Sequence, residues 1–162
     1  VMSTAAHQDG PDGTLELMVT VADRDVTDSG WQPSLVLFFA PGSTPIGDVA
    51  TPDNGFHNFE GSIAAYAQHR MFPGLGSYFY SKAKREDGTF DWDQVYADTL
   101  PLPTTGTALK LSRKDGKVRS FYSLDSGDTW TQIGGEYLLA PDYRHVPLKV
   151  GYRMHLEYKT SY

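Results

Sequence analysis

Short segments in which apolar residues alternate with polar ones, separated by glycine and proline, set the strongest limit on how this chain can fold. The segment at 14–21 places Leu15, Leu17, Val19 and Val21 at every second position. That period is typical of a strand with one buried face. With 16 Gly and 10 Pro among 162 residues, the pattern predicts an all-β fold made of short strands and turns.

Further segments fit the same fold class. The unbroken apolar run at 34–40 predicts a central strand covered on both faces. The segment at 62–69 fits a strand or a short helix, and its position before the alternating segment at 77–83, across a turn at 72–76, favours the strand. These segments predict two neighbouring strands in the first half of the chain.

The last third of the chain carries the clearest turn chemistry. Asp115-Gly116 lies between the alternating segments 109–113 and 118–124, which is typical of a tight hairpin. Strands are also expected at 131–133, 148–152 and 155–159. About eight or nine strands without a long helix predict a two-sheet antiparallel β-sandwich.

The remaining segments are expected to be loops or an arm. Residues 1–13 are small, polar and rich in Gly and Asp, so we expect an N-terminal arm or linker, with 14–162 forming a single β-sandwich domain. The segment at 41–61 is expected to be a long loop with room for a short helix, and 85–103 a second loop-rich stretch.

Composition excludes several classes of partner and site. The net charge is −6, and no Lys/Arg-rich stretch is longer than 82–85, so the sequence does not predict nucleic acid as a partner. No apolar run approaches the roughly 18 residues of a membrane span. The lack of Cys excludes disulfides, zinc-thiolate sites and cysteine nucleophiles.

No signal-peptide pattern follows Val1, which indicates a mature form or a piece of a longer protein.

The sequence SLDSGDTW at 123–130 matches the Asp-box pattern at every defined position. In such a turn the aspartate accepts hydrogen bonds from turn amides, the glycine supplies a positive φ, and the tryptophan packs the turn onto the core. The chain has one box and no internal repeat, which excludes a complete sialidase propeller. The residues that we assign to this structural turn are Ser123, Asp125, Gly127, Thr129 and Trp130.

The stretch at 109–134, LKLSRKDGKVRSFYSLDSGDTWTQIG, together with VPLKVGYRM at 146–154, resembles the late strands of concanavalin A-like (laminin-G-like) lectin/glucanase modules. The resemblance implies a jelly-roll β-sandwich in which an opening strand pairs with the closing one, although nothing before Thr14 looks like a strand. It also implies a secreted or cell-surface bacterial setting, beside glycoside hydrolase domains or within a larger protein.

Catalytic patterns are weak. Retaining glucanases of this fold place Glu, Asp and Glu on alternate residues of one strand, and none of the five Glu residues has that spacing. Asp91 and Asp93 flank Trp92 and share one strand face, but Asp-x-Asp is more often turn chemistry. The five His residues show no short metal-binding spacing. Whether the chain is an enzyme stays open, with the balance favouring a non-catalytic module.

No cofactor is required by these patterns, and calcium is the one metal that the sequence suggests. Asp23, Asp25 and Asp28 place three carboxylates in a short loop, and carboxylate oxygens are ligands that calcium takes. Their spacing departs from the EF-hand pattern, so an exposed acidic turn is the favoured interpretation.

The aromatic residues divide into two groups. Phe38, Phe39, Phe121 and Trp130 are expected to be core residues. The others lie in loops or alternate with polar residues, as flat platforms for sugar rings do beside hydrogen-bonding side chains. The candidate ligand-binding residues are Trp31, Tyr66, His69, Arg70, Tyr78, Tyr80, Asp91, Trp92, Asp93 and Tyr96, and Gln68 is a further side chain that could supply hydrogen bonds beside them. The alternative is that the tyrosines pair across strands only to stabilise the sheet.

The sequence therefore favours a non-catalytic carbohydrate-binding, lectin-like module of a larger secreted or cell-surface protein. Its expected partner is a glycan or a neighbouring domain of the same polypeptide. A structural or protein-interaction β-sandwich is the first alternative, and a glycoside hydrolase fragment is the second.

Overall fold

The computed structural model describes residues 2–21, 31–44, 63–72, 76–97 and 105–158, and for 31–33 and 155–158 the backbone alone. These residues form ten strands and one short 3-10 turn, η1. The elements are β1 (Thr14–Thr20), β2 (Trp31–Pro41), β3 (Ala65–Phe72), β4 (Gly76–Lys84), β5 (Phe90–Ala97), β6 (Ala108–Lys114), β7 (Lys117–Ser123), β8 (Thr131–Gln132), β9 (Tyr137–Leu138), η1 (Pro141–Tyr143) and β10 (Leu148–Tyr158).

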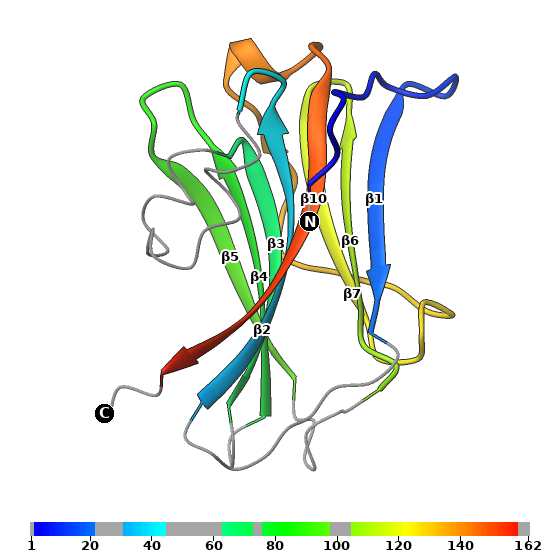
Figure 1. The fold of residues 1–162 in the computed structure, drawn as a ribbon, viewed down its shortest axis with the longest axis vertical. Helices are drawn as coiled ribbons and strands as arrows, with labels where there is room; N and C mark the ends of the chain where they lie inside the picture. The colour runs from blue at the N-terminus through cyan, green and yellow to red at the C-terminus, as the bar shows by residue number, and fades with distance from the viewer. Residues whose placement is uncertain (1, 22–30, 45–62, 73–75, 98–104, 159–162) are drawn as a thin grey trace.

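The strands form two antiparallel sheets. One has the order β1-β6-β7-β8, with β9 also paired to β7, and the other has the order β10-β2-β3-β4-β5. Figure 1 shows them as two layers that face each other. This arrangement confirms the predicted all-β, two-sheet antiparallel sandwich. Among the described residues, no helix is long and apolar enough to cross a membrane.

The main core fills the space between the two sheets. Alternate residues of β2 and β6, such as Leu37 and Leu111, are fully buried there. The rings of Phe79 on β4 and Tyr122 on β7 stack with centroids 4.0 Å apart, which joins the sheets near their centre. Burial of this apolar surface is the main force that holds the layers together.

Strand β2 is buried on both of its faces, as its apolar run predicts. Val36 and Phe38 point away from the main core, yet they are almost fully buried. They pack with Met2, Ile63 and Tyr66 in a second, smaller apolar cluster. The outer face of β2 is therefore covered by side chains from outside the strand, including Met2 of the N-terminal segment and Ile63.

The N-terminal segment lies against β10, as Figure 1 shows, and two isolated bridges join them. The Ser3 amide donates to the carbonyl of Val150 at 2.7 Å, and His7 and Leu148 exchange two backbone hydrogen bonds at 2.7 and 3.0 Å. These are isolated bridges and not a continuous strand. The opening segment therefore contacts the closing strand although its sequence has no strand pattern.

Some sequence-based boundaries were wrong. The expected loop at 85–103 contains β5, an edge strand whose polar residues conceal its period. The helix alternative for 62–69 is excluded where the structure describes it, because β3 covers 65–72. The strands expected at 148–152 and 155–159 are one strand, β10. The long loop at 41–61 lies mostly outside the described residues.

Candidate functional site

The outer face of β3, β4 and β5 brings together most of the predicted ligand-binding residues. Even-numbered residues of these three strands point away from the main core, because successive side chains alternate between faces. The antiparallel register then aligns them in rows across the sheet. The rows are Tyr66–Lys82–Trp92, Gln68–Tyr80–Gln94 and Arg70–Tyr78–Tyr96.

A cavity of about 240 Å³ lies on this face, and we call it the outer-face groove. Its floor is formed by buried side chains, including Tyr66 and Gln68, whereas Trp92 is 57% exposed at the rim. Gln68 donates through Nε2 to the Ser34 hydroxyl at 2.8 Å, which fixes the orientation of its amide. The groove is lined by Tyr66, Gln68, Arg70, Tyr80, Lys82, Trp92 and Gln94.

Cations pack against aromatic rings across this face. The Lys82 ammonium lies 5.4 Å from the centre of the Tyr66 ring, and the Arg70 guanidinium lies 5.3 Å from the centre of the Phe72 ring. At both distances an attractive cation–π interaction is expected. The aromatic rings therefore hold the charged groups of both basic side chains close to the outer face.

Tyr78 and Tyr96 lie on the same face beside the groove but do not line it. Their ring centroids are 5.1 Å apart, and Tyr78 also meets Phe72 edge-on at 4.9 Å. Such cross-strand aromatic pairs stabilise a sheet. For Tyr78 the structure therefore supports the stabilising role that the sequence left open.

The prediction that His69 binds a ligand beside Arg70 does not fit the groove, because His69 lies on the inner face of β3. The ring is fully buried, stacks on Phe79 with centroids 4.5 Å apart, and has Nε2 2.9 Å from the Ser77 hydroxyl. Its odd position in the strand places it opposite to its neighbours Gln68 and Arg70. A ligand in the outer-face groove does not contact it.

Asp91 and Asp93 share one face of β5, as predicted, but it is the face opposite to Trp92. Asp91 forms an ion pair with Arg85, whose Nε donates to it at 2.8 Å. Asp93 accepts hydrogen bonds from the Gly135 amide at 2.8 Å and from the Tyr137 hydroxyl. Both carboxylates therefore secure the edge of the sandwich and do not line the groove.

The contact with Asp93 also affects the chemistry of Tyr137. Burial, followed by the hydrogen bond to the Asp93 carboxylate, raises the pKa of Tyr137 to about 12. Both causes disfavour the phenolate, since it would lose solvation and face a carboxylate. Tyr137 therefore remains a proton donor to Asp93 throughout the physiological pH range.

The turn at 123–130 is held by hydrogen bonds from its own side chains. Asp125 accepts from the Thr129 amide at 2.9 Å and from the Ser123 hydroxyl at 2.6 Å. The Ser123 hydroxyl in turn accepts from the Gly127 amide at 2.8 Å, and Gly127 has a φ of 94°. Hydrogen bonds from Ser123 and then Thr129 lower the pKa of Asp125 to about 2.

Two of the aromatics assigned to the core lie instead on the outer face of the other sheet. Phe121 and Trp130 are half-buried. The Lys110 ammonium lies 4.7 Å from the Phe121 ring centre and 4.5 Å from that of Trp130. The expectation of a core position was wrong because Phe121 lies on the outward side of β7 and Trp130 contacts the same Lys110 ammonium. Phe38 and Phe39 are buried, as expected.

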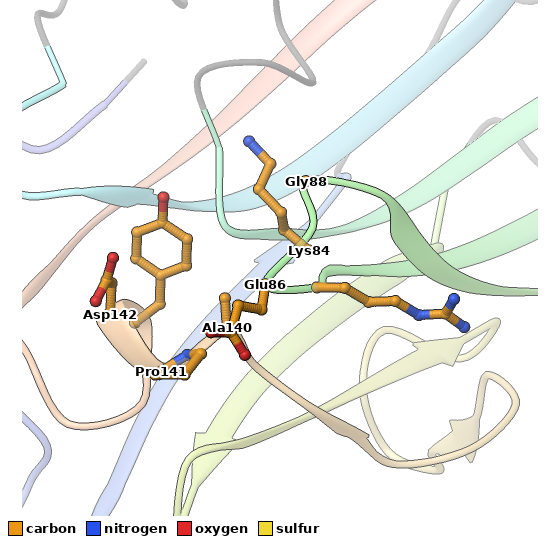
Figure 2. A pocket seen from close by; sticks show the side chains of 8 residues that line it. Lys84, Glu86, Gly88, Ala140, Pro141 and Asp142 are labelled. Carbon is orange, nitrogen blue, oxygen red and sulfur yellow. The ribbon is translucent and has the colours of Figure 1, made fainter.

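A second cavity, of about 200 Å³, lies at one end of the sandwich. Figure 2 shows it between the β4–β5 turn, with Glu86 and Gly88, and the segment around η1, with Pro141 and Asp142. Its lining carries charges of both signs, and its aromatic residue is the half-buried Tyr143. No residue predicted from the sequence lies in it.

The suggested metal site falls outside the part of the chain that the structure describes. Asp23, Asp25 and Asp28 belong to the segment 22–30, which is not described. Among the described residues, no group of three His, Asp or Glu side chains is close enough to hold a metal ion. The Trp31 side chain also lies outside the description.

Sequence reasoning missed two lining residues, Lys82 and Gln94. Both share the even parity of Tyr80 and Trp92 in their strands, so alternation from those aromatics would have indicated them once both strands were recognised. Gln94 was hidden because β5 was taken for a loop. The groove brings together four of the candidate ligand-binding residues, Tyr66, Arg70, Tyr80 and Trp92, and also Gln68, the further hydrogen-bonding residue.

Comparisons with known proteins add little to this geometry. No family model matches the chain, and no curated protein matches its sequence. Among solved structures it is similar to the mouse laminin alpha1 chain, domains LG4-5, at 11% sequence identity and a TM-score of 0.23. The match covers 99% of this chain and 45% of that chain, so this chain spans less than half of its length. The fold class therefore rests on strand order and register.

Proposed function

We propose that this chain is a non-catalytic carbohydrate-binding module whose ligand occupies the outer-face groove. The observation that carries the proposal is the exposed indole of Trp92 beside amide and basic side chains in one groove. Sugar rings present C–H faces to flat aromatic side chains and hydroxyls to hydrogen-bonding groups. The groove combines both kinds of partner on the rigid strands β3, β4 and β5.

Each lining residue has a defined part in this proposal. Trp92 and Tyr80 supply the aromatic platforms. Gln68 and Gln94 lie on either side of Tyr80 in the middle row and offer amide donors and acceptors. The bond from Gln68 to Ser34 orients that amide before a ligand arrives, which lowers the entropy cost of binding.

The non-catalytic part of the proposal rests on where the carboxylates lie. Hydrolysis of a glycosidic bond by the usual route needs two carboxyl groups that flank the bond. The described lining of the outer-face groove contains no Asp or Glu. Asp91 and Asp93, the nearest acids in sequence, point to the opposite face and bond to Arg85 and Tyr137.

The setting of the module is proposed from its sequence. The turn at 123–130 has the sequence of an Asp-box, and the hydrogen bond from the Thr129 amide fits the role that the pattern assigns to Asp125. Together with the resemblance of 109–134 to lectin-like modules, this supports a place within a larger extracellular or cell-surface protein.

Binding to a glycan array, followed by affinity electrophoresis, tests the proposal. We expect Trp92→Ala and Tyr80→Ala each to raise the Kd of a retained glycan about tenfold, or about 1.4 kcal/mol, because a stacking platform is lost. Met18→Ala is the matched control, since Met18 is 55% exposed but lies on β1 of the other sheet. Retention of no glycan, or unchanged binding by Trp92→Ala, would contradict the proposal.

A protein-interaction module is the second candidate. Trp92 and Tyr96, at 57% and 50% exposure, lie on the edge strand β5, and exposed aromatic residues are enriched at protein interfaces. This candidate predicts that Trp92→Ala weakens association with a neighbouring domain while no glycan is retained. Turnover of an aryl glycoside that is lost in Asp93→Asn would instead favour the hydrolase alternative.

A further inference from the structure

The edges of the two sheets differ in how they are protected. An edge strand exposes backbone groups that can pair with another chain, and proteins usually shorten, cover or charge such edges. In the described part of this chain, β8 and β9 have only two residues each. Strand β10 is bonded to the N-terminal segment at Ser3 and His7, and β1 carries the exposed Glu16 on its outer face. The edge formed by β5 differs from all of these.

Strand β5 is long, and its outer face is exposed and uncharged. It spans eight residues and pairs with β4 on one side, and the described residues place no strand on its other side. Its outward side chains Trp92, Gln94 and Tyr96 are all exposed. None of the three is charged, although the chain has a net charge of −6. A second copy can therefore approach this edge without bringing like charges together on the outer face.

The two acids of β5 do not oppose such an approach, because their own chain already binds them. Asp91 accepts a hydrogen bond from Arg85 Nε at 2.8 Å. Asp93 accepts from the Gly135 amide at 2.8 Å and from the Tyr137 hydroxyl. Inward charges protect many sheet edges by keeping them hydrated. Here both carboxylates keep their partners when another strand pairs with β5.

The sequence of β5 selects one register for pairing with itself. About a two-fold axis perpendicular to the sheet, paired residues share a face, so only residues of equal parity can be opposite. Two such registers pair nearly the whole strand. One sets Asp93 opposite its own copy, which brings two carboxylates together. The other sets Gln94 opposite its own copy, Trp92 opposite Tyr96 and Asp93 opposite Val95, so aromatic meets aromatic and no acid meets an acid.

We infer that this chain forms a two-fold dimer in which the β5 edges of two copies pair antiparallel with Gln94 at the axis. The pairing satisfies edge backbone groups and joins the two β10-β2-β3-β4-β5 sheets into one. Such an interface uses the same surface of both copies and closes after two. Tyr96 of the second copy then lies beside Trp92 in the outer-face groove, whatever the ligand of the groove is.

The first test is sedimentation equilibrium of the intact chain over a range of concentrations. No glycan is present, so the result does not depend on the proposed carbohydrate binding. We expect a reversible dimer with twice the 17.9 kDa mass of the chain. A chain that is still monomeric at roughly 1 mM, or one that forms larger open assemblies, would overturn the inference.

The second test places a charge at the two-fold axis. Because Gln94 faces its own copy, Gln94→Lys and Gln94→Glu should each raise the Kd of the dimer about tenfold or more. An equimolar mixture of the two variants should form a heterodimer, since the opposed charges then attract. Gln132→Lys and Gln132→Glu are the matched controls, because Gln132 is an exposed glutamine on β8 of the other sheet.

Thermal melting shows whether each of these variants is folded. Two results in folded variants would overturn the inference. One is dimerisation of both Gln94 variants with the wild-type Kd, and the other is a mixture that associates no better than either variant alone.

The third test measures the register. The chain has no Cys, so Gln94→Cys carries a single thiol. Directly opposite residues of antiparallel strands have Cα atoms about 4.5–5.5 Å apart, which a disulfide can span. We expect mild oxidation to link Gln94→Cys into a covalent dimer much faster than Gln132→Cys. In the register centred on Asp93 the two Gln94 positions are about 8 Å apart, so equal rates for the two variants would overturn the inference.

Discussion

Asp125 shows how a single exposed side chain can organise a turn. Its carboxylate accepts hydrogen bonds from Ser123 and Thr129, and these bonds favour the ionised form. The pKa of Asp125 is accordingly lowered from 3.8 to about 2 in the folded chain. The turn is therefore more stable when this group is charged.

The first prediction concerns the pH dependence of stability. Since the pKa of Asp125 is lower in the folded state, its contribution is present in full above the unfolded-state value of 3.8 and is lost as the pH falls to about 2. Asp125→Asn should therefore melt at a lower temperature than the wild type at neutral pH, and the gap should close across that window. Thermal melting between pH 7 and about pH 2 checks this. A gap that is independent of pH would refute it.

Gly134 is the residue where backbone conformation and a neighbouring side chain impose the same requirement. It has a φ of 65°, and a Cβ atom there would overlap the Asp93 carboxylate. Asp93 in turn accepts bonds from Gly135 and Tyr137, so it cannot easily move. Only glycine satisfies both conditions at this position.

The second prediction compares this glycine with one that lacks a close neighbour. Gly88 also has a positive φ, 84°, but a Cβ atom there would meet nothing within 4 Å. We expect Gly88→Ala to cost about 1 kcal/mol through its backbone alone. Gly134→Ala should cost about 3 kcal/mol or more, because Asp93 must also be displaced. Urea denaturation measures both, and equal losses would show that the Asp93 contact is unimportant.

At the scale of elements, the sequence predicted a strand only where the strand has an apolar face or consists of an unbroken apolar run. Leu15 and its neighbours revealed β1, and the apolar run at 34–40 revealed β2 within Trp31–Pro41. Strand β5 was missed because its inward residues include Asp91 and Asp93, and the partners of Asp93, Gly135 and Tyr137, lie far away in the sequence. An edge strand with paired acids on one side and aromatics on the other has no hydrophobic alternation to detect.

The sequence also predicted part of the candidate site. The sequence indicated Tyr66, Tyr80 and Trp92 as aromatic residues in loops or among polar residues, and Arg70 as a hydrogen-bonding side chain near them, and the groove contains all four. Sequence proximity failed for His69, because adjacent residues in a strand point to opposite faces. Register between strands, which decides which side chains meet, depends on tertiary packing and was not available from composition or local pattern.

Arg113 joins three elements through one buried side chain. From β6 it donates to Asp9 of the N-terminal segment at 2.7 Å, and to the carbonyls of Tyr143 and Val146 at 2.8 and 2.7 Å. Its side chain is fully buried, so each of these bonds replaces a bond to water. The N-terminal segment and the segment after η1 therefore depend on β6 for their positions.

The third prediction tests that junction. Arg113→Ala should lower the free energy of unfolding by about 3 kcal/mol, because two carbonyls and a carboxylate lose their buried donor. Arg85→Ala is the control: its ion pair with Asp91 is on the surface, and it should cost less than about 1 kcal/mol. Guanidinium denaturation measures the difference. Similar losses for both variants would contradict a central role for Arg113.

At the scale of the whole molecule, the two sheets are coupled through a small set of central contacts. Phe79 of β4 lies between His69 of β3 and Tyr122 of β7, with ring centroids at 4.5 and 4.0 Å. Beside it, the hydroxyl of Ser81 donates to that of Ser120 across the interface at 2.8 Å. The outer-face groove lies on the reverse side of these same strands, so its geometry depends on how firmly the sheets are joined.

The fourth prediction follows from that coupling. Phe79→Ala should reduce stability by about 3–5 kcal/mol, because it removes a fully buried ring that both sheets contact. Phe79→Leu should cost less than Phe79→Ala, since it leaves a smaller cavity, and Phe121→Ala, which removes a half-buried ring on the outer face, should cost about 1 kcal/mol. Far-ultraviolet and near-ultraviolet circular dichroism should report one coincident transition in each variant. Two separate transitions would show that the sheets unfold independently and that Phe79 does not link them.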